Sequence, residues 1–443
     1  METFLIRALQ LILSLSILVL VHEFGHFIFA RIFKVRVEKF YLFFDPWFSL
    51  FKFKPKNSET EYGIGWLPLG GYCKISGMID ESMDKEAMAQ PAKPYEFRSK
   101  PAGQRLMIMI AGVLFNFLLA LFIYSMVLYT WGETYLPLKN MKHGMYYSEA
   151  FQEVGFRDGD ILLKANNEEL DRLDQSSFRK VVEASNVTVL RDGVETVIPI
   201  PEDMMQRFMR EGKGFASPDR VPMVVKKLSE KDSPAATAGL QPGDSIVSIN
   251  GQATPLFEDV AKMLDQNKGK DITLGFYRDG MEQSVVIQPD TAGKIGVYRM
   301  STTELYPTVT RTYGFFESFP AGVRLGINTL KGYVNDMKYV FTKEGASSLG
   351  GFGTIGSIFP TVWDWQVFWM QTAFLSIILA FMNILPIPAL DGGHVMFLLY
   401  EVIARRKPSD KFLEYAQITG MFLLFALLIY ANGNDIFRFF FKS

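Results

Sequence analysis

The chain has 443 residues, enough for two to four domains, and a formal net charge of −1, which excludes the strongly basic composition typical of nucleic-acid binders. Its single cysteine, Cys73, excludes an intramolecular disulfide, so the fold needs no oxidising compartment. Hydrophobic residues make up 49% of the chain and charged residues 21%, which indicates membrane segments joined to a soluble portion.

Four segments are apolar and long enough to cross a bilayer of roughly 30 Å. In chain order they are residues 4–30, 106–131, 367–390 and 412–430. The first is not typical of a signal peptide, because its apolar run is too long and basic residues follow it. The pattern therefore predicts a polytopic α-helical membrane protein with four transmembrane helices.

Basic residues predict the orientation of these spans. Lysines and arginines gather in residues 31–105 and again in 405–411, the two segments that join successive spans. By the positive-inside rule both segments are cytoplasmic. Both termini and residues 132–366 are then predicted to lie outside.

Residues 58–78 have the pattern of a β-hairpin. Apolar side chains alternate with small or polar ones up to Trp66, Gly70 and Gly71 offer a turn, and alternation resumes at Tyr72. This segment is either an ordinary cytosolic hairpin or a membrane-associated one. The second case requires protein around it, because lipid cannot satisfy backbone polar groups.

The outer region contains an internal repeat. Residues 222–290 show a Gly-Asp pair, a strand, a turn, a helix and two further strands, and residues 133–201 show a weaker copy. We predict two small domains at 133–218 and 219–305, with a linker near 202–220. Membrane segments at 1–132 and 367–443 flank them.

Residues 306–366 join the repeat to the third span. Apolar residues at spacings of three and four predict a helix over 320–343, either lying at the membrane interface or packed on the soluble domains. Five glycines in residues 345–356 predict a loop or hinge.

The first span carries the motif His22-Glu23-Phe24-Gly25-His26. Histidines four residues apart share one face of a helix and can bind one metal ion, while the glutamate beside them can act as a general base. A chance match is the alternative. The chain has four histidines, however, and two of them lie here, in an apolar span where ionisable groups are costly and usually functional.

A catalytic zinc ion normally has three protein ligands, so one more is needed. No acid follows His26 until Glu38, which places the third ligand elsewhere in the membrane. Asp391 is the acid of the segment 383–394, at the cytoplasmic end of the third span and at the depth of His26. His394, three residues further on, is the alternative ligand.

Pro386 and Pro388 remove two backbone donors near the end of the third span, just after Asn383. The alternatives are a simple proline kink and a full break in the helix. A break at this depth requires a protein-lined or watered cavity, which a hydrolase also needs.

Four features together resemble the bacterial site-2 proteases, which are intramembrane zinc metalloproteases. They are HEFGH in the first span, WLPLGGYCK after it, the tandem Gly-Asp repeats, and NILPIPALDGGH in the third span. The resemblance covers nearly the whole chain. It implies that the repeats are two α+β PDZ domains, that His22, His26 and Asp391 bind Zn²⁺, that Glu23 is the catalytic acid/base, and that Asn383 helps to hold the substrate.

The resemblance also implies a place and a class of substrate. The place is the bacterial inner membrane, with the PDZ region on the periplasmic side and the active site toward the cytoplasm. The substrates are single-pass membrane proteins already trimmed by another protease, such as an anti-sigma factor, or remnants of signal peptides. Membrane lipid is the other partner, and nucleic acid is not one.

A substrate helix must unwind before hydrolysis, and an extended segment can pair with a strand edge. The predicted hairpin offers such an edge, with substrate-binding residues Gly65, Leu67, Gly70, Gly71 and Tyr72. We expect the PDZ region to admit substrates by the size of their outer domains. The alternatives are an inactive membrane scaffold whose PDZ domains bind protein C-termini, and a zinc transporter with acids or histidines in several spans.

Overall fold

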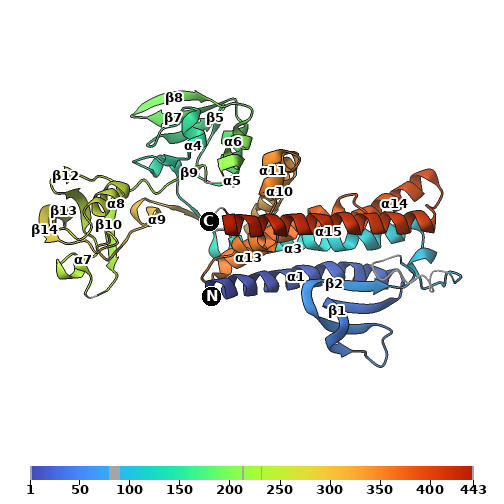
Figure 1. The fold of residues 1–443 in the computed structure, drawn as a ribbon. Coiled ribbons are helices and arrows are strands. Elements are labelled where there is room, and N and C mark those ends of the chain that lie inside the picture. Colours follow the sequence, from blue (N-terminus) through green and yellow to red (C-terminus); the bar gives the residue numbers. More distant parts are fainter. Residues whose placement is uncertain (1, 79–89, 212–213, 231, 442–443) are drawn as a thin grey trace. The chain divides into compact units, whose positions relative to one another are not determined.

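The computed structural model describes residues 2–78, 90–211, 214–230 and 232–441. The chain forms two compact units, one from Met1–Gly132 with Thr312–Ser443 and the other from Glu133–Arg311 (Figure 1). Each unit has its own buried apolar clusters.

Within its described residues, the first unit contains four helices that are long and apolar enough to cross a membrane, which agrees with the four predicted spans. They are α1 (Glu2–Ile32), α3 (Ala102–Trp131), α13 (Trp365–Ile384) and α15 (Asp410–Phe441). The third is shorter than predicted. It ends at Ile384, and a separate helix, α14 (Asp391–Ala404), begins after the two prolines. The predicted break is therefore complete rather than a kink.

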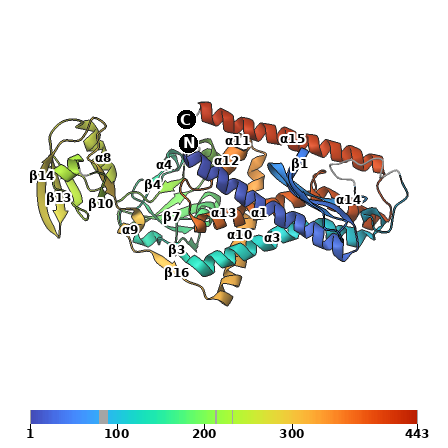
Figure 2. The same cartoon turned by 90° about the horizontal axis from the view of Figure 1, so that it is seen from below.

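Helix α3 lies at the centre of this unit and packs against α1, α10, α13 and α14. One buried cluster joins Ala120, Ile123, Tyr124 and Val127 of α3 to α13. Helix α15 lies at the edge of this group in the view of Figure 2. Most of its apolar side chains are exposed, as expected for a helix that faces lipid.

The predicted hairpin is wrong in its pairing. Glycines 70 and 71 do not form a turn but lie within one long strand, β2 (Glu61–Ile75), which pairs with β1 (Val37–Phe53). Both strands bend, so each pairs with two separate segments of the other. Tyr41 of β1, for example, faces both Gly63 and Tyr72 of β2. The result is a small sheet with its segments in the order 49–53, 61–65, 37–42 and 71–75, in which segment 71–75 is an edge.

The sheet has an apolar tip. Trp47 is 91% exposed, and Phe48, Leu50, Phe51 and Phe53 are all more than half exposed. A contiguous row of exposed aromatic and aliphatic side chains is unfavourable in water. The tip therefore favours a membrane-associated sheet over a cytosolic one.

Helix α10 (Phe315–Val340) occurs close to the predicted position and packs against α3. It places a row of small residues, Ser318, Gly322 and Gly326, against α3. A methyl group at Gly322 would lie 2.5 Å from the backbone nitrogen of Ser125, so the glycine permits this close approach. The predicted apolar face remains partly exposed, with Phe341 at 89%.

The glycine-rich segment is not the predicted loop or hinge. It forms two short helices, α11 (Lys343–Ser348) and α12 (Phe352–Ser357), that are fixed to the end of α15. Asp435 accepts hydrogen bonds from the backbone N–H groups of Gly351 and Thr354 at 3.0 and 2.9 Å. Arg438 donates to the carbonyl oxygen of Leu349.

The second unit contains the same order of elements twice, as the repeat predicts. The first copy has a four-stranded sheet in the order β6-β5-β7-β8 and the helix α5; its elements are β5 (Ile161–Ala165), β6 (Glu168–Glu169), α5 (Gln175–Glu183), β7 (Asn186–Arg191) and β8 (Val194–Pro199). The second copy consists of β11 (Ser245–Ile249), β12 (Gln252–Ala253), α8 (Phe257–Gln266), β13 (Ile272–Arg278) and β14 (Met281–Ile287). The sheet of the second copy extends through β10 (Met223–Leu228) and β15 (Val297–Arg299).

Shorter elements complete the two units. They are η1 (Phe97–Ser99), β3 (Glu133–Tyr135), η2 (Leu138–Asn140), β4 (Tyr146–Tyr147), α4 (Glu149–Glu153), α6 (Met204–Glu211), β9 (Ala216–Ser217), α7 (Pro234–Thr237), α9 (Thr302–Leu305) and β16 (Val309–Arg311). Helix α6 lies in the predicted linker. Its Phe208 packs on Phe178 with ring centroids 4.6 Å apart, so this stretch belongs to the first copy.

Both copies use the same ion pair. Arg191 binds Asp160 through two hydrogen bonds of 2.8 and 2.7 Å, and Arg278 binds Asp244 at the same two distances. Burial opposes ionisation of Asp244, but its bonds to Arg278 hold its pKa below the usual value. The aspartate comes from the Gly-Asp pair of each repeat, which explains why that pair recurs.

Candidate active site

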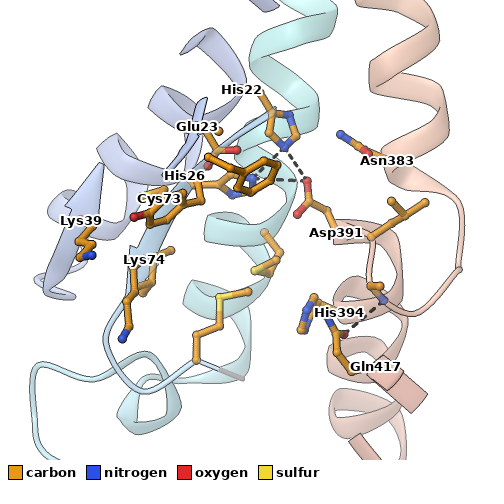
Figure 3. Close-up of a pocket in the computed structure, with 18 residues that line it drawn as sticks. His22, Glu23, His26, Lys39, Cys73, Lys74, Asn383, Asp391, His394 and Gln417 are labelled. Carbon is orange, nitrogen blue, oxygen red and sulfur yellow. Dashed lines mark hydrogen bonds and ion pairs between the residues drawn. The ribbon is translucent and has the colours of Figure 1, made fainter. Parts of the chain in front are cut away.

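Helix α1 presents both histidines of the HExxH motif on one buried face, 9% and 6% exposed. The Nε2 atoms of His22 and His26 are 3.2 Å apart, and their rings meet edge to face (Figure 3). The four-residue spacing on a helix produces this arrangement directly. Two imidazole nitrogens this close are a suitable pair of ligands for one metal ion.

Asp391 completes the cluster from the far end of the sequence. It is the first residue of α14, and its Oδ2 atom lies 3.1 Å from Nε2 of His22 and 3.3 Å from Nε2 of His26. A tetrahedral zinc ion with bonds of roughly 2.0–2.1 Å holds its ligand atoms about 3.3 Å apart. The triangle formed by these three atoms therefore fits zinc, with the fourth position left for water or substrate.

The other nitrogen of each histidine also has a neighbour. Nδ1 of His26 is 2.9 Å from the carbonyl oxygen of Ile108, a bond that leaves Nε2 free to bind metal. Nδ1 of His22 faces the amide of Asn116 on α3, with Nδ2 3.3 Å away. The Oδ1 atom of Asn116 is buried and has no partner among the described residues. A rotation of the Asn116 amide that exchanges its oxygen and nitrogen lets Oδ1 accept from Nδ1 and orients His22 for metal binding.

Glu23 lies beside the two histidines, where a general base is needed. Its carboxylate lies near the backbone of Cys73 in the edge segment of the sheet. It also lines a cavity of about 550 Å³ together with His22, His26 and Asp391. The Glu23 carboxylate, a proton acceptor, and the three converging ligand atoms therefore face the same cavity.

The residues that line this cavity can be compared with the substrate-binding residues and the alternative ligand predicted from the sequence. Asn383, Gly71 and Tyr72 line it, as does His394. Gly65, Leu67 and Gly70 are not among the described lining residues, and Gly65 is buried against the backbone of Phe44 inside the sheet. His394 lies outside the group of three ligand atoms that are all within 4.8 Å of one another.

Three neighbours of the site were missing from the sequence prediction: Asn116, Gly112 and Gln417. Gly112 and Gly25 let α3 and α1 approach closely, since a methyl group on Gly25 would lie 2.5 Å from the carbonyl oxygen of Ala111. Asn116 is fully buried, and Gln417 is 4% exposed and lines the cavity. Asn116 and Gln417 could have been found from the sequence, because each is a lone amide in an apolar span and polar side chains in such spans are usually functional.

Among the described residues, four helices long and apolar enough to span a membrane and a His-Glu-His-Asp cluster at a cavity define a polytopic membrane protein with a metal-dependent hydrolase centre. Comparison with known families agrees: residues 10–427 match the model of peptidase family M50, and the chain belongs to that family. It is a site-2-type zinc metalloprotease of the intramembrane class.

Named relatives match almost the whole chain. A regulator of sigma E protease from Salmonella typhi is 29% identical over 96% of this chain and 97% of its own length. The protease RseP of Yersinia pestis is 28% identical with the same coverage. A protein named as a zinc metalloprotease in Borreliella burgdorferi is 27% identical, again over 96% and 97%. The chain is similar to these proteins along its full architecture, including the second unit.

Proposed function

We propose that this protease cuts transmembrane segments of single-pass membrane proteins at a zinc centre formed by His22, His26 and Asp391, with Glu23 as the acid/base. The observation that carries the proposal is the triangle of ligand atoms with sides of 3.1–3.3 Å next to Glu23. These groups belong to helices α1 and α14, so the chemistry takes place at membrane depth.

Zinc, when bound, polarises the scissile carbonyl and activates a water molecule for attack. Glu23 takes the proton from the attacking water and later delivers it to the leaving amine. The backbone of Cys73 lies beside the carboxylate of Glu23, at the edge segment on which the substrate is proposed to pair. Ile108 and Asn116 hold the two imidazoles from the side away from the cavity.

A transmembrane substrate must expose its peptide bonds before they can react. Segment 71–75 is an edge strand that lines the cavity, so an unwound substrate can add to it as a further strand. Asn383 lies in the same cavity, on α13, and can hold the substrate from the other side. The proposed pairing thus uses Gly71, Tyr72 and the residues after them, rather than Gly65, Leu67 and Gly70.

The variant Glu23→Gln tests this function. Loss of the proton acceptor should lower cleavage of a model single-span substrate by about 10²-fold or more. Zinc should remain bound, because Glu23 is not a ligand. Cleavage of the substrate in proteoliposomes and zinc content per chain are the two measurements.

The matched control is Glu59→Gln, a change of the same chemistry at a side chain that is 65% exposed. It should cleave at the rate of the unmodified protein. Undiminished cleavage by Glu23→Gln would reject the acid/base role and the mechanism with it.

We further propose that the protein resides in a bacterial inner membrane with residues 132–366 on the periplasmic side and the active site toward the cytoplasm. The excess of lysine and arginine in residues 31–105 and 405–411 supports this orientation. Alkaline phosphatase, which is active only outside the cytoplasm, should be active when fused at Glu202 and inactive when fused at Lys407. The opposite result would invert the topology.

The second unit is proposed to contain two PDZ domains that select substrates by the size of their outer part. Each copy combines a small antiparallel sheet with short helices, and neither is part of the unit that holds the catalytic cluster. Such a domain can therefore exclude or recruit substrates but supplies no catalytic group from the described residues.

Deletion of residues 133–300 separates exclusion from recruitment. If the domains exclude large substrates, the deletion should permit cutting of a substrate that still has its outer domain. If they recruit, the deletion should weaken cutting of trimmed and untrimmed forms alike. Rates for both forms of one substrate decide the question, and loss of both activities would contradict the proposed selection by size.

A further inference from the structure

The turn that carries the proposed ligand Asp391 has an unusual backbone. It connects the end of α13 at Ile384 to the start of α14 at Asp391. Ala389, two residues before the ligand, has a φ of +78°, in the left-handed region that residues with a side chain rarely adopt. Such a conformation persists only when surrounding contacts hold it.

The contact that holds it comes from α15. Pro386 and Pro388 have no N–H group, and the N–H groups of Leu385, Ile387 and Leu390 donate to carbonyl oxygens within three residues. The remaining donor of the turn, the N–H of Ala389, is bound by the Oε1 atom of Gln417 at 3.2 Å. A side chain from the fourth span therefore completes the hydrogen bonding of the turn.

The surface of α15 at this point is shaped for the turn. Within residues 411–430, all of which the structure describes, only Gln417 and Gly420 are buried. They are three residues apart and share one face of the helix. A methyl group on Gly420 would overlap the carbonyl oxygen of Pro388, so this glycine permits the contact. The rest of the span exposes apolar side chains.

We propose that Gln417 is a positioning residue of the metal centre. By fixing Ala389, it holds Asp391 at the distance from His22 and His26 that zinc requires, and it makes α15 part of the site. This inference rests on the proposed ligand set. It assigns the fourth span a role in metal binding, through Gln417 and Gly420, the two buried residues within 411–430.

The test uses purified full-length protein and measures zinc affinity by competition with a chelator. Gln417→Met keeps the length of the side chain but removes the acceptor, and it should weaken zinc binding by about 10- to 100-fold, the range for residues that orient a ligand. Gln417→Glu keeps an acceptor oxygen and should recover most of the affinity. Thr419→Val, on the exposed side of the same helix, should bind zinc as the unmodified protein does.

A second measurement follows hydrogen exchange at Ala389 and changes no residue of the turn itself. In the metal-free protein, the amide hydrogen of Ala389 should exchange slowly, and Gln417→Met should accelerate its exchange while the thermal unfolding temperature stays close to that of the unmodified protein. Unchanged zinc affinity in Gln417→Met, or fast exchange at Ala389 in the unmodified protein, would overturn the inference. Failure of the unmodified protein to bind zinc would instead reject the proposed function.

Discussion

Asp391→Asn should remove most of the zinc from the purified protein and abolish its cleavage of membrane substrates. The substitution keeps the size of the side chain but replaces the carboxylate, whose Oδ2 atom lies 3.1 and 3.3 Å from the two histidine nitrogens. A neutral amide is a weak ligand for zinc and brings no charge to balance the ion. We expect the affinity for zinc to fall by more than about 100-fold, beyond the range for residues that only orient a ligand. Zinc per chain and the cleavage rate measure the two effects.

His394→Ala is the decisive comparison, because His394 was the alternative ligand. It lines the same cavity but does not belong to the group of converging ligand atoms. This variant should retain its zinc. If His394→Ala loses the metal and Asp391→Asn keeps it, the proposed ligand set is wrong.

The sequence predicted the proposed ligands because their evidence is local or chemical. A four-residue spacing fixes His22 and His26 on one face of any helix, whatever else the chain does. Asp391 was harder, since it lies far along the chain. It could still be selected because few acids occur in apolar spans, because it lies at the same membrane depth as the histidines, and because the resemblance to the site-2 proteases implies it.

The sheet next to the site shows where such reasoning fails. Gly70 and Gly71 are adjacent glycines between two alternating segments, which is the usual pattern of a hairpin turn. In the structure they continue strand β2 instead, and Gly71 lies where a methyl group would be 2.6 Å from the carbonyl oxygen of Tyr41. The glycine serves close packing between strands. The fold of this sheet depends on pairing between strand segments about thirty residues apart, and the local alternation of side chains does not encode such pairing.

The same limit applies to the glycine-rich segment before the third span. Five glycines predicted a hinge, yet the backbone donors of Gly351 and Thr354 are bound by Asp435, more than eighty residues later. A glycine-rich segment acts as a hinge only when no other group binds its backbone. Here the small side chains allow α12 to lie directly against α15, where Asn432 would touch any added methyl group on Gly351.

Gly112→Ala should disrupt the zinc centre although residue 112 is neither a ligand nor an acid. Gly112 lies on α3 directly behind the two imidazoles. A methyl group there would lie 2.8 Å from Cε1 of His22 and closer still to Nε2 of His26, the atom proposed to bind zinc. The rings would have to move, and the triangle with Asp391 would open. We expect loss of most bound zinc and of cleavage, while the helix itself gains slightly, since alanine favours a helix over glycine by about 1 kcal/mol.

Gly103→Ala is the matched control, on the same helix and with no atom within 4 Å of the added methyl group. It should keep both zinc and activity. Zinc content, circular dichroism and thermal unfolding of the two variants distinguish a local effect from misfolding: Gly112→Ala should retain helical structure while it loses metal. A Gly112→Ala protein that binds zinc as tightly as Gly103→Ala would show that α3 does not lie against the histidines, and the close packing of α1 and α3 around the site would have to be revised.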